Sequence, residues 1–170
     1  MRKALAFWAL LLLAGMTLNG CQKIEARMEL KRGNSLYKDE QYKDALEAFL
    51  KGLELDPEAT FAWRSVGLCN LALFRPGKKT QENIDFANRA IEAFTLYLKD
   101  FPEAPKILEY IVNLYFAAER LDEGIAYLKQ FSIDHPLDNT VHLHMVSLMT
   151  KAGKIPDALE WANTHEGSSQ

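Results

Sequence analysis

The chain has 170 residues, of which 48% are hydrophobic and 25% are charged, values typical of a folded globular protein rather than a disordered one. Its formal net charge is −3, and without Arg2 and Lys3 it falls to −5, because 18 basic residues then stand against 23 acidic ones. This balance argues against a nucleic-acid-binding protein, which needs a cationic surface for phosphate. The two cysteines, Cys21 and Cys69, lie in such different contexts that a disulfide framework is not expected.

Residues 1–20 have the pattern of an export signal. A basic start is followed by an apolar stretch from Ala4 to Met16, and small or polar residues then lead to Cys21. The apolar stretch is too short to cross a bilayer as a helix. The sequence therefore predicts a targeting segment at residues 1–20.

The tetrapeptide at residues 18–21, Leu-Asn-Gly-Cys, resembles the lipobox of bacterial lipoproteins. The resemblance implies that Cys21 carries two or three acyl chains, palmitate among them, and becomes the first residue of the mature chain, with residues 21–25 as a short tether. Two or more chains give lasting membrane anchorage. Gln22, where an aspartate would signal inner-membrane retention, favours the periplasmic face of the outer membrane in a diderm bacterium. An ordinary cleaved signal, with Cys21 incidental, is the alternative.

A repeat of about 34 residues follows. Small residues recur at spacings of 45, 34 and 34, each with a larger or apolar residue four positions later. The small residues are Ala45, Ala90, Gly124 and Ala158, and their followers are Phe49, Phe94, Leu128 and Ala162. Twelve residues after the first three come Pro57, Pro102 and Pro136. Such prolines end one helix and suit the start of the next, so the repeat predicts stacked helical hairpins.

Apolar residues recur at helical spacing between these markers, and nothing alternates at the period of a strand. The pattern predicts four pairs of helices and no strands. They are expected at 26–39 with 42–55, 58–73 with 81–100, 104–118 with 121–134, and 138–151 with 155–165.

With these markers aligned, residues 26–165 resemble the tetratricopeptide repeat family. The first hairpin carries the pattern through Gly33, Tyr42, Ala45 and Gly52, and the second supplies Trp63 and Gly67. The third and fourth are weaker. The resemblance implies an all-α, tetratricopeptide-type α-solenoid of about four hairpins in a right-handed superhelix. Its hairpins would span about 26–59, 60–104 with an insertion, 105–138 and 139–165, with a flexible tail at 166–170.

The resemblance also implies a concave groove lined by the first helix of each hairpin. Its expected partner-binding residues are Asn34, Tyr37, Lys38, Arg64, Leu68, Leu71, Lys106, Glu109, Asn113, Phe116, Leu143 and Ser147. They mix apolar and polar types, as a peptide-binding groove does, although any solvated helix face with a few apolar residues has the same mixture. A carboxylate clamp of the kind found in some members is incomplete, because Leu30, Ser65 and Tyr110 stand where polar or basic partners are required.

Eleven extra residues precede Ala90, around the basic segment from Arg75 to Asn83. They are expected to lengthen the loop of the second hairpin and its second helix. The basic residues are interpreted as a solvated loop, with contact to anionic lipid headgroups as the alternative.

No residue constellation in the sequence predicts an enzyme, a metal site or a cofactor. His142 and His144 are two residues apart, which points them to different sides of a helix. Cys69 lies in an apolar helical run and is expected to fill the core rather than react.

The leading hypothesis is a non-catalytic scaffold or adaptor, lipid-anchored in the cell envelope, whose groove holds a protein or peptide partner at the membrane surface during assembly of an envelope complex. A self-associating structural component is the alternative. In that case Trp161, to one side of the apolar residues of the last helix, would mark the surface where copies meet. Trp161 could also be a capping contact.

Overall fold

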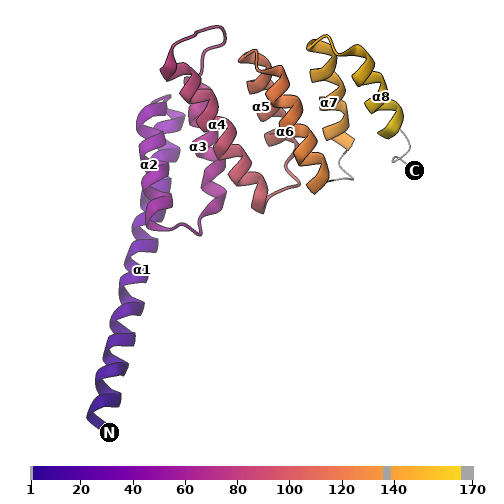
Figure 1. The fold of residues 1–170 in the computed structure, drawn as a ribbon. Helices are drawn as coiled ribbons and strands as arrows, with labels where there is room; N and C mark the ends of the chain where they lie inside the picture. The colour runs from indigo at the N-terminus through magenta and orange to yellow at the C-terminus, as the bar shows by residue number, and fades with distance from the viewer. Residues whose placement is uncertain (1, 136–138, 166–170) are drawn as a thin grey trace. The chain divides into compact units, whose positions relative to one another are not determined.

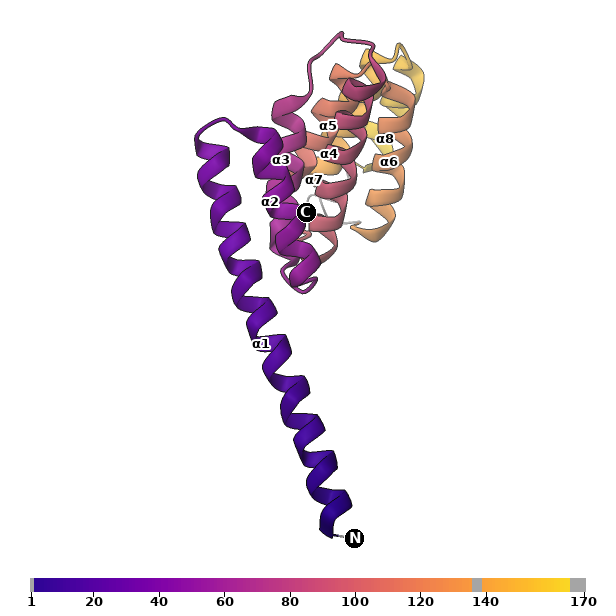
Figure 2. The ribbon, with the colours of Figure 1, turned by 90° about the vertical axis from the view of Figure 1, so that its left-hand side faces the viewer.

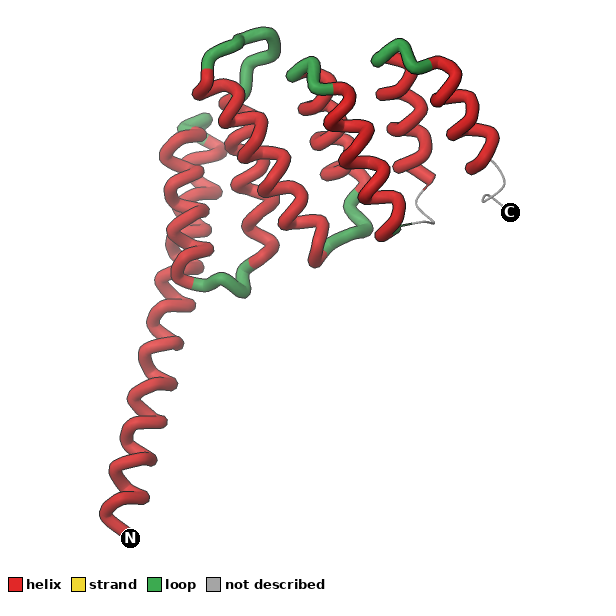
Figure 3. Tube along the Cα trace, viewed as in Figure 1, coloured by secondary structure: helices red, strands yellow, loops and turns green. Residues whose placement is uncertain are grey.

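The protein is built from α-helices joined by short loops, as Figures 1 and 3 show. The computed structural model describes residues 2–135 and 139–165, with side chains from Gly20 onward except at Asn139. The described residues contain no strand. In chain order the elements are α1 (Arg2–Lys38), α2 (Tyr42–Leu55), the 3₁₀ turn η1 (Thr60–Ala62), α3 (Trp63–Leu73), α4 (Gln81–Asp100), α5 (Pro105–Ala117), α6 (Leu121–Asp134), α7 (Asn139–Lys151) and α8 (Ile155–His165).

The chain divides into two compact units, Met1–Leu73 and Phe74–Gln170. The boundary falls between α3 and the loop that precedes α4. The sequence predicts α3 and α4 as one hairpin of a single solenoid. The boundary between the two units instead separates these helices, at the start of the inserted segment.

In the first unit, α1 and α2 form a hairpin whose helices approach closely at glycine. A Cβ atom at Gly33 would lie 2.9 Å from the Phe49 ring, and one at Gly52 would lie 2.5 Å from a methyl carbon of Leu30. No side chain fits in either place without displacing its neighbour. The hairpin also carries an ion pair across its surface, from Lys51 Nζ to Glu29 at 3.0 Å, a solvent-screened contact that contributes little to stability.

Helix α1 begins far upstream of the position predicted for the first helix. It runs without interruption from Arg2 through Cys21, and its N-terminal half projects beyond the hairpin with α2 (Figure 2). The predicted start at residue 26 is therefore wrong for the intact chain. Residues 4–16 are mostly Ala and Leu, which favour helix, and no proline lies between them and Ala26. Among the described residues, no helix is long and apolar enough to cross a membrane.

In the second unit, α4 to α8 pack in sequence, each against the next. Phe94, Leu108 and Leu128 are completely or almost completely buried and occupy its core. The small residues of the repeat lie at the contacts, because a Cβ at Gly124 would stand 2.9 Å from both Tyr115 Cβ and Leu148 Cδ1.

The other predicted helix bounds agree with the structure within one residue, except at α3. There, the predicted start at 58 is replaced by the turn η1, and the α-helix begins at Trp63. Helix α4 has 20 residues where α2 and α6 have 14, which confirms the predicted lengthening. The expected flexible tail at 166–170 and the turn at Pro136 lie outside the described residues.

Candidate partner-binding surface

Helix α5 presents four of the predicted groove residues along one side. Lys106, Glu109, Asn113 and Phe116 are spaced by three, four and three, which places them on one helical face. Lys106 donates to both carboxylate oxygens of Glu109, at 2.9 and 3.0 Å. The hydrogen bond to Glu109 raises the pKa of Lys106. The face therefore carries a local ion pair at its start and an exposed aromatic ring at its end.

Helix α7 continues this surface. Leu143 is 71% exposed, and Ser147, four residues later, is also exposed. Lys151 lies one turn further, and its Nζ stands 5.0 Å from the centre of the Phe116 ring on α5. This cation–π contact shows that the two faces adjoin. We call Asn113, Phe116, Leu143, Ser147 and Lys151 the α5/α7 surface.

Sequence reasoning missed Lys151. It lies four residues after Ser147 and eight after Leu143, so helical spacing alone places it on the same face as both. Its contact with Phe116 depends on the packing of α7 against α5, which the spacing does not supply.

The remaining groove residues lie in the first unit. On α1, Asn34 and Lys38 are exposed, and Tyr37 is half-buried with its ring 5.2 Å from that of Tyr42. On α3, Arg64 is exposed, whereas Leu68 and Leu71 are half-buried and follow it at helical spacing. Each set occupies one face of its own helix.

The positions that would complete a carboxylate clamp are used for packing. Leu30 is buried against Gly52, and the Tyr110 ring stacks 5.6 Å from the Phe94 ring. Ser65 is half-buried. These three residues therefore do not complete a carboxylate clamp.

The two cysteines have opposite environments. Cys21 is exposed on α1. Cys69 is completely buried in α3, and burial raises the pKa of its thiol to about 12. Only Cys21 is accessible for modification.

Trp161 packs within the last hairpin. Its ring stacks 4.1 Å from that of His165 on the same helix and lies 5.8 Å from that of His142 on α7. By contrast, Ile155 and Leu159 are 47% and 61% exposed. An outward apolar surface on α8 is thus formed by Ile155 and Leu159, with Trp161 half-buried beside them.

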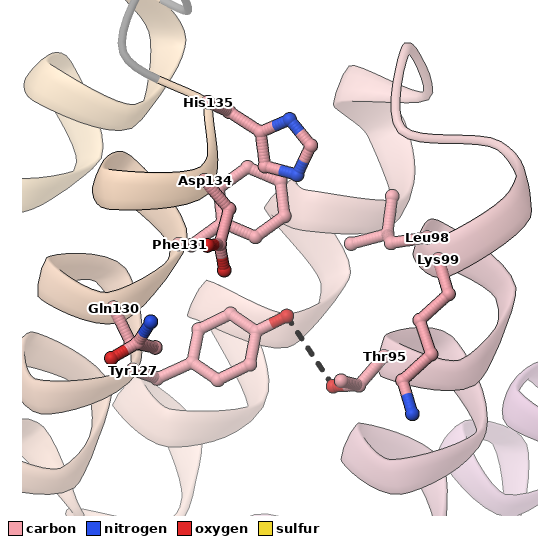
Figure 4. A pocket seen from close by; sticks show the side chains of 8 residues that line it. All are labelled: Thr95, Leu98, Lys99, Tyr127, Gln130, Phe131, Asp134 and His135. Carbon is pink, nitrogen blue, oxygen red and sulfur yellow. Dashed lines mark hydrogen bonds between the residues drawn. The ribbon is translucent and has the colours of Figure 1, made fainter.

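A small pocket lies between α4 and α6 (Figure 4). Thr95 donates to the Tyr127 hydroxyl at 3.3 Å, and burial raises the pKa of Tyr127 to about 12. That phenol is therefore no base at neutral pH. The volume, about 180 Å³, is below the roughly 300 Å³ at which ligand pockets begin.

Within the described ranges, 2–135 and 139–165, no three His, Cys, Asp or Glu side chains gather closely enough to hold a metal ion. The rings of His142 and His165 lie with their centres 4.4 Å apart. Among the described residues, no third His, Cys, Asp or Glu joins them to form a metal site.

Comparison with known proteins identifies the class of fold. Residues 30–105, just under half of the chain, match the model of the tetratricopeptide repeat family. Comparison with curated proteins finds no match. The described helices, this family match and the solved structures below together show an all-α fold of the tetratricopeptide solenoid type.

Three solved structures show the same fold at low sequence identity. The first tetratricopeptide domain of Spaghetti (RPAP3), bound to the HSP90 peptide SRMEEVD, is 14% identical with a TM-score of 0.50, covering 77% of this chain and 98% of that one. MamA from Desulfovibrio magneticus RS-1, residue 41 to the end, is 18% identical with a TM-score of 0.53, covering 85% and 77%. A MamA RS-1 double mutant is 17% identical with a TM-score of 0.55, covering 85% and 75%.

Proposed function

We propose that the protein is a non-catalytic scaffold that binds a protein partner and is held at a bacterial envelope membrane by lipid on Cys21. The observation that carries the proposal is the α5/α7 surface, where Phe116 and Leu143 are exposed beside polar side chains. Exposed apolar groups with hydrogen-bonding neighbours are typical of a peptide-binding surface. The fold supports this use, since the similar RPAP3 domain is described as bound to a peptide.

The partner would contribute an apolar side chain against Phe116 and Leu143, and backbone groups to Asn113 and Ser147. Buried aromatic contacts carry much of the affinity at such surfaces. Assembly of an envelope complex would be the process that this surface supports.

Photo-crosslinking in intact cells tests the surface. A photoreactive side chain at Leu143 is expected to give one discrete protein adduct, which Phe116→Glu removes. The same group at Ile133 on α6 is the matched control, because Ile133 is also 71% exposed. Identical adducts from positions 133 and 143, or adducts indifferent to Phe116→Glu, would contradict binding at this surface.

The anchor is a separate part of the proposal. Cys21 is exposed, and the helix places it about 7.5 Å along its axis from Ala26, the first buried residue described, at about 1.5 Å per residue. A lipid at Cys21 would therefore hold the first hairpin close to the membrane surface. Cys21→Ser is expected to release the protein from the membrane fraction, and unchanged fractionation would rule out this tether.

Self-association is the second candidate function, supported by the exposed Ile155 and Leu159 on α8. They are four residues apart and so lie on one face of a terminal helix. A chain without residues 1–21 is then expected to form oligomers that Leu159→Glu dissociates. A strict monomer at high concentration would eliminate this candidate.

A further inference from the structure

The inserted loop before α4 lines one side of a cavity that the α5/α7 surface does not include. Its volume is about 370 Å³, within the range of ligand-binding pockets. Apolar walls come from Phe74, Ile84, Ala87 and Ala117, and the opposite side is the turn between α5 and α6. All of these residues belong to the second unit, where the two loops lie at the same end of the helices (Figure 3).

The loop is held in place by one buried side chain. Asn83, 3% exposed, accepts a hydrogen bond from Arg75 N at 2.7 Å. Its amide donates to the carbonyl oxygens of Arg75 and Lys78, both at 2.8 Å. Gly77 supplies a φ of +78°, which favours glycine. A loop fixed by three bonds from one side chain preforms the cavity wall, which lowers the ordering cost of binding.

The basic side chains around the cavity differ in whether they already have hydrogen-bond partners. Arg120 is bound to both Glu123 carboxylate oxygens, at 2.9 and 2.6 Å, and to Asn88 at 2.6 Å. Lys78 and Lys79 are exposed on the loop side, and within the described part of the chain neither ammonium has an ion-pair or hydrogen-bond partner. Glu119 is the acidic residue of the lining, on the α5–α6 turn. The cavity thus offers apolar walls with two uncommitted cations on one side.

We propose that this cavity is a second binding site, separate from the α5/α7 surface, for an acidic peptide segment of a partner protein. An aliphatic side chain of the segment enters the cavity against Ile84 and Ala117. Neighbouring carboxylates meet Lys78 and Lys79, on the side away from Glu119. Charge complementarity of this kind selects the partner more than it adds affinity.

A lipid surface fits the same cations less well. The loop from Arg75 to Thr80 carries no large apolar side chain to insert between lipids, and Glu119 would face the anionic headgroups. The shape also favours a peptide, because a concave apolar pocket accepts one side chain but not a flat bilayer surface.

The test uses the full chain in phosphatidylcholine nanodiscs and the fluorescein-labelled peptide Ser-Gly-Glu-Ile-Glu-Ser-Gly, with binding followed by fluorescence anisotropy. Lys78→Glu with Lys79→Glu is expected to weaken binding about fivefold, a typical effect of two exposed ion pairs. Lys31→Glu with Lys129→Glu changes the net charge equally at exposed sites outside the cavity and should leave affinity within about twofold.

Ile84→Ser tests the apolar wall, and Ile133→Ser is its matched control at an exposed isoleucine of α6. The first is expected to weaken binding and the second to leave it unchanged. A probe with lysines in place of both glutamates should bind more weakly than the acidic probe. Equal binding of the two probes, or equal binding by the Lys78/Lys79 variant and the original chain, would overturn the proposal.

A second experiment, with lipid vesicles, tests whether the two lysines bind a membrane instead of a peptide. The nanodisc-held chain is mixed with vesicles of phosphatidylserine and phosphatidylcholine and then sedimented. Capture by these vesicles that depends on Lys78 and Lys79, without binding of the acidic peptide, would replace the peptide site with a membrane contact. Because no residue of the α5/α7 surface is changed, failure here leaves the proposed function intact.

Discussion

Burial determines the chemistry of Cys69. Its thiol has no exposed surface, and burial raises its pKa from 9.0 to about 12. At pH 8 about one thiol in ten thousand is then ionised, and the thiolate is the nucleophile. In a Cys21→Ser chain, we expect iodoacetamide to leave Cys69 unlabelled until urea unfolds the protein. Labelling of the folded chain at the rate of a free thiol would contradict this environment.

The same shift has a consequence for stability. The folded pKa of Cys69 lies above the unfolded value, so the stabilising contribution of the neutral thiol is fully present below pH 9 and is lost as the pH rises to about 12. Urea unfolding of the Cys21→Ser chain should therefore show stability falling above pH 9. Cys69→Ala should reduce the slope in that range, and an unchanged slope would assign it to other groups such as Tyr127, whose pKa is also raised.

Asn83 holds the inserted loop through its side chain. Asn83→Ala removes three hydrogen bonds at a buried position and should lower the free energy of unfolding by about 1–3 kcal/mol. Asn88→Ala is the control, because Asn88 is exposed and accepts one bond from Arg120. Urea titration measures both, and equal losses would show that the loop contributes nothing specific.

At the scale of helices, the recurring small residues set how closely neighbours pack. Gly124 lies where α6 meets α5 and α7, with no space for a side chain. Gly124→Val should destabilise by about 1–3 kcal/mol, the usual cost of overpacking. Ala126→Val is the control, because it also introduces a β-branched residue into α6 but at an exposed position where no neighbour is displaced. It should lower the free energy of unfolding by well under about 1 kcal/mol. Thermal unfolding compares the two, and equal shifts would show that Gly124 is not a contact residue.

At the scale of the whole molecule, Gly52 and Gly124 each make their close contacts inside one unit. Gly52 meets Leu30 and Ala26 in the first unit, and Gly124 meets Tyr115 and Leu148 in the second. In repeat proteins stability is roughly a sum of local interfaces. Gly52→Val should therefore speed amide hydrogen exchange in α1 and α2, and Gly124→Val in α5 to α7. Equal acceleration throughout the chain for either variant would show one cooperative unit instead.

Local patterns in the amino-acid sequence predict most of the helices and the small residues at which neighbouring helices pack. Helical spacing and the repeated small residue predict six of the eight α-helices in the described residues within one residue at both ends, because both signals are local, and α1 and α3 are the exceptions. The predicted start of the first helix at residue 26 is wrong, because α1 continues through Asn19 and Gly20 and no proline in residues 17–26 interrupts it. The predicted roles of Cys21, the groove and Trp161 stay predictions.

Tertiary structure decided which side chains meet across helices and which remain exposed. The contact of Lys151 with Phe116 joins residues 35 positions apart, so no local pattern contains it. The same holds for the cavity between the inserted loop and the α5–α6 turn, and for the exposure of Ile155 and Leu159, whose spacing equally suits a buried stripe. Periodicity defines the faces of a helix, but only packing determines which of those faces a neighbour covers.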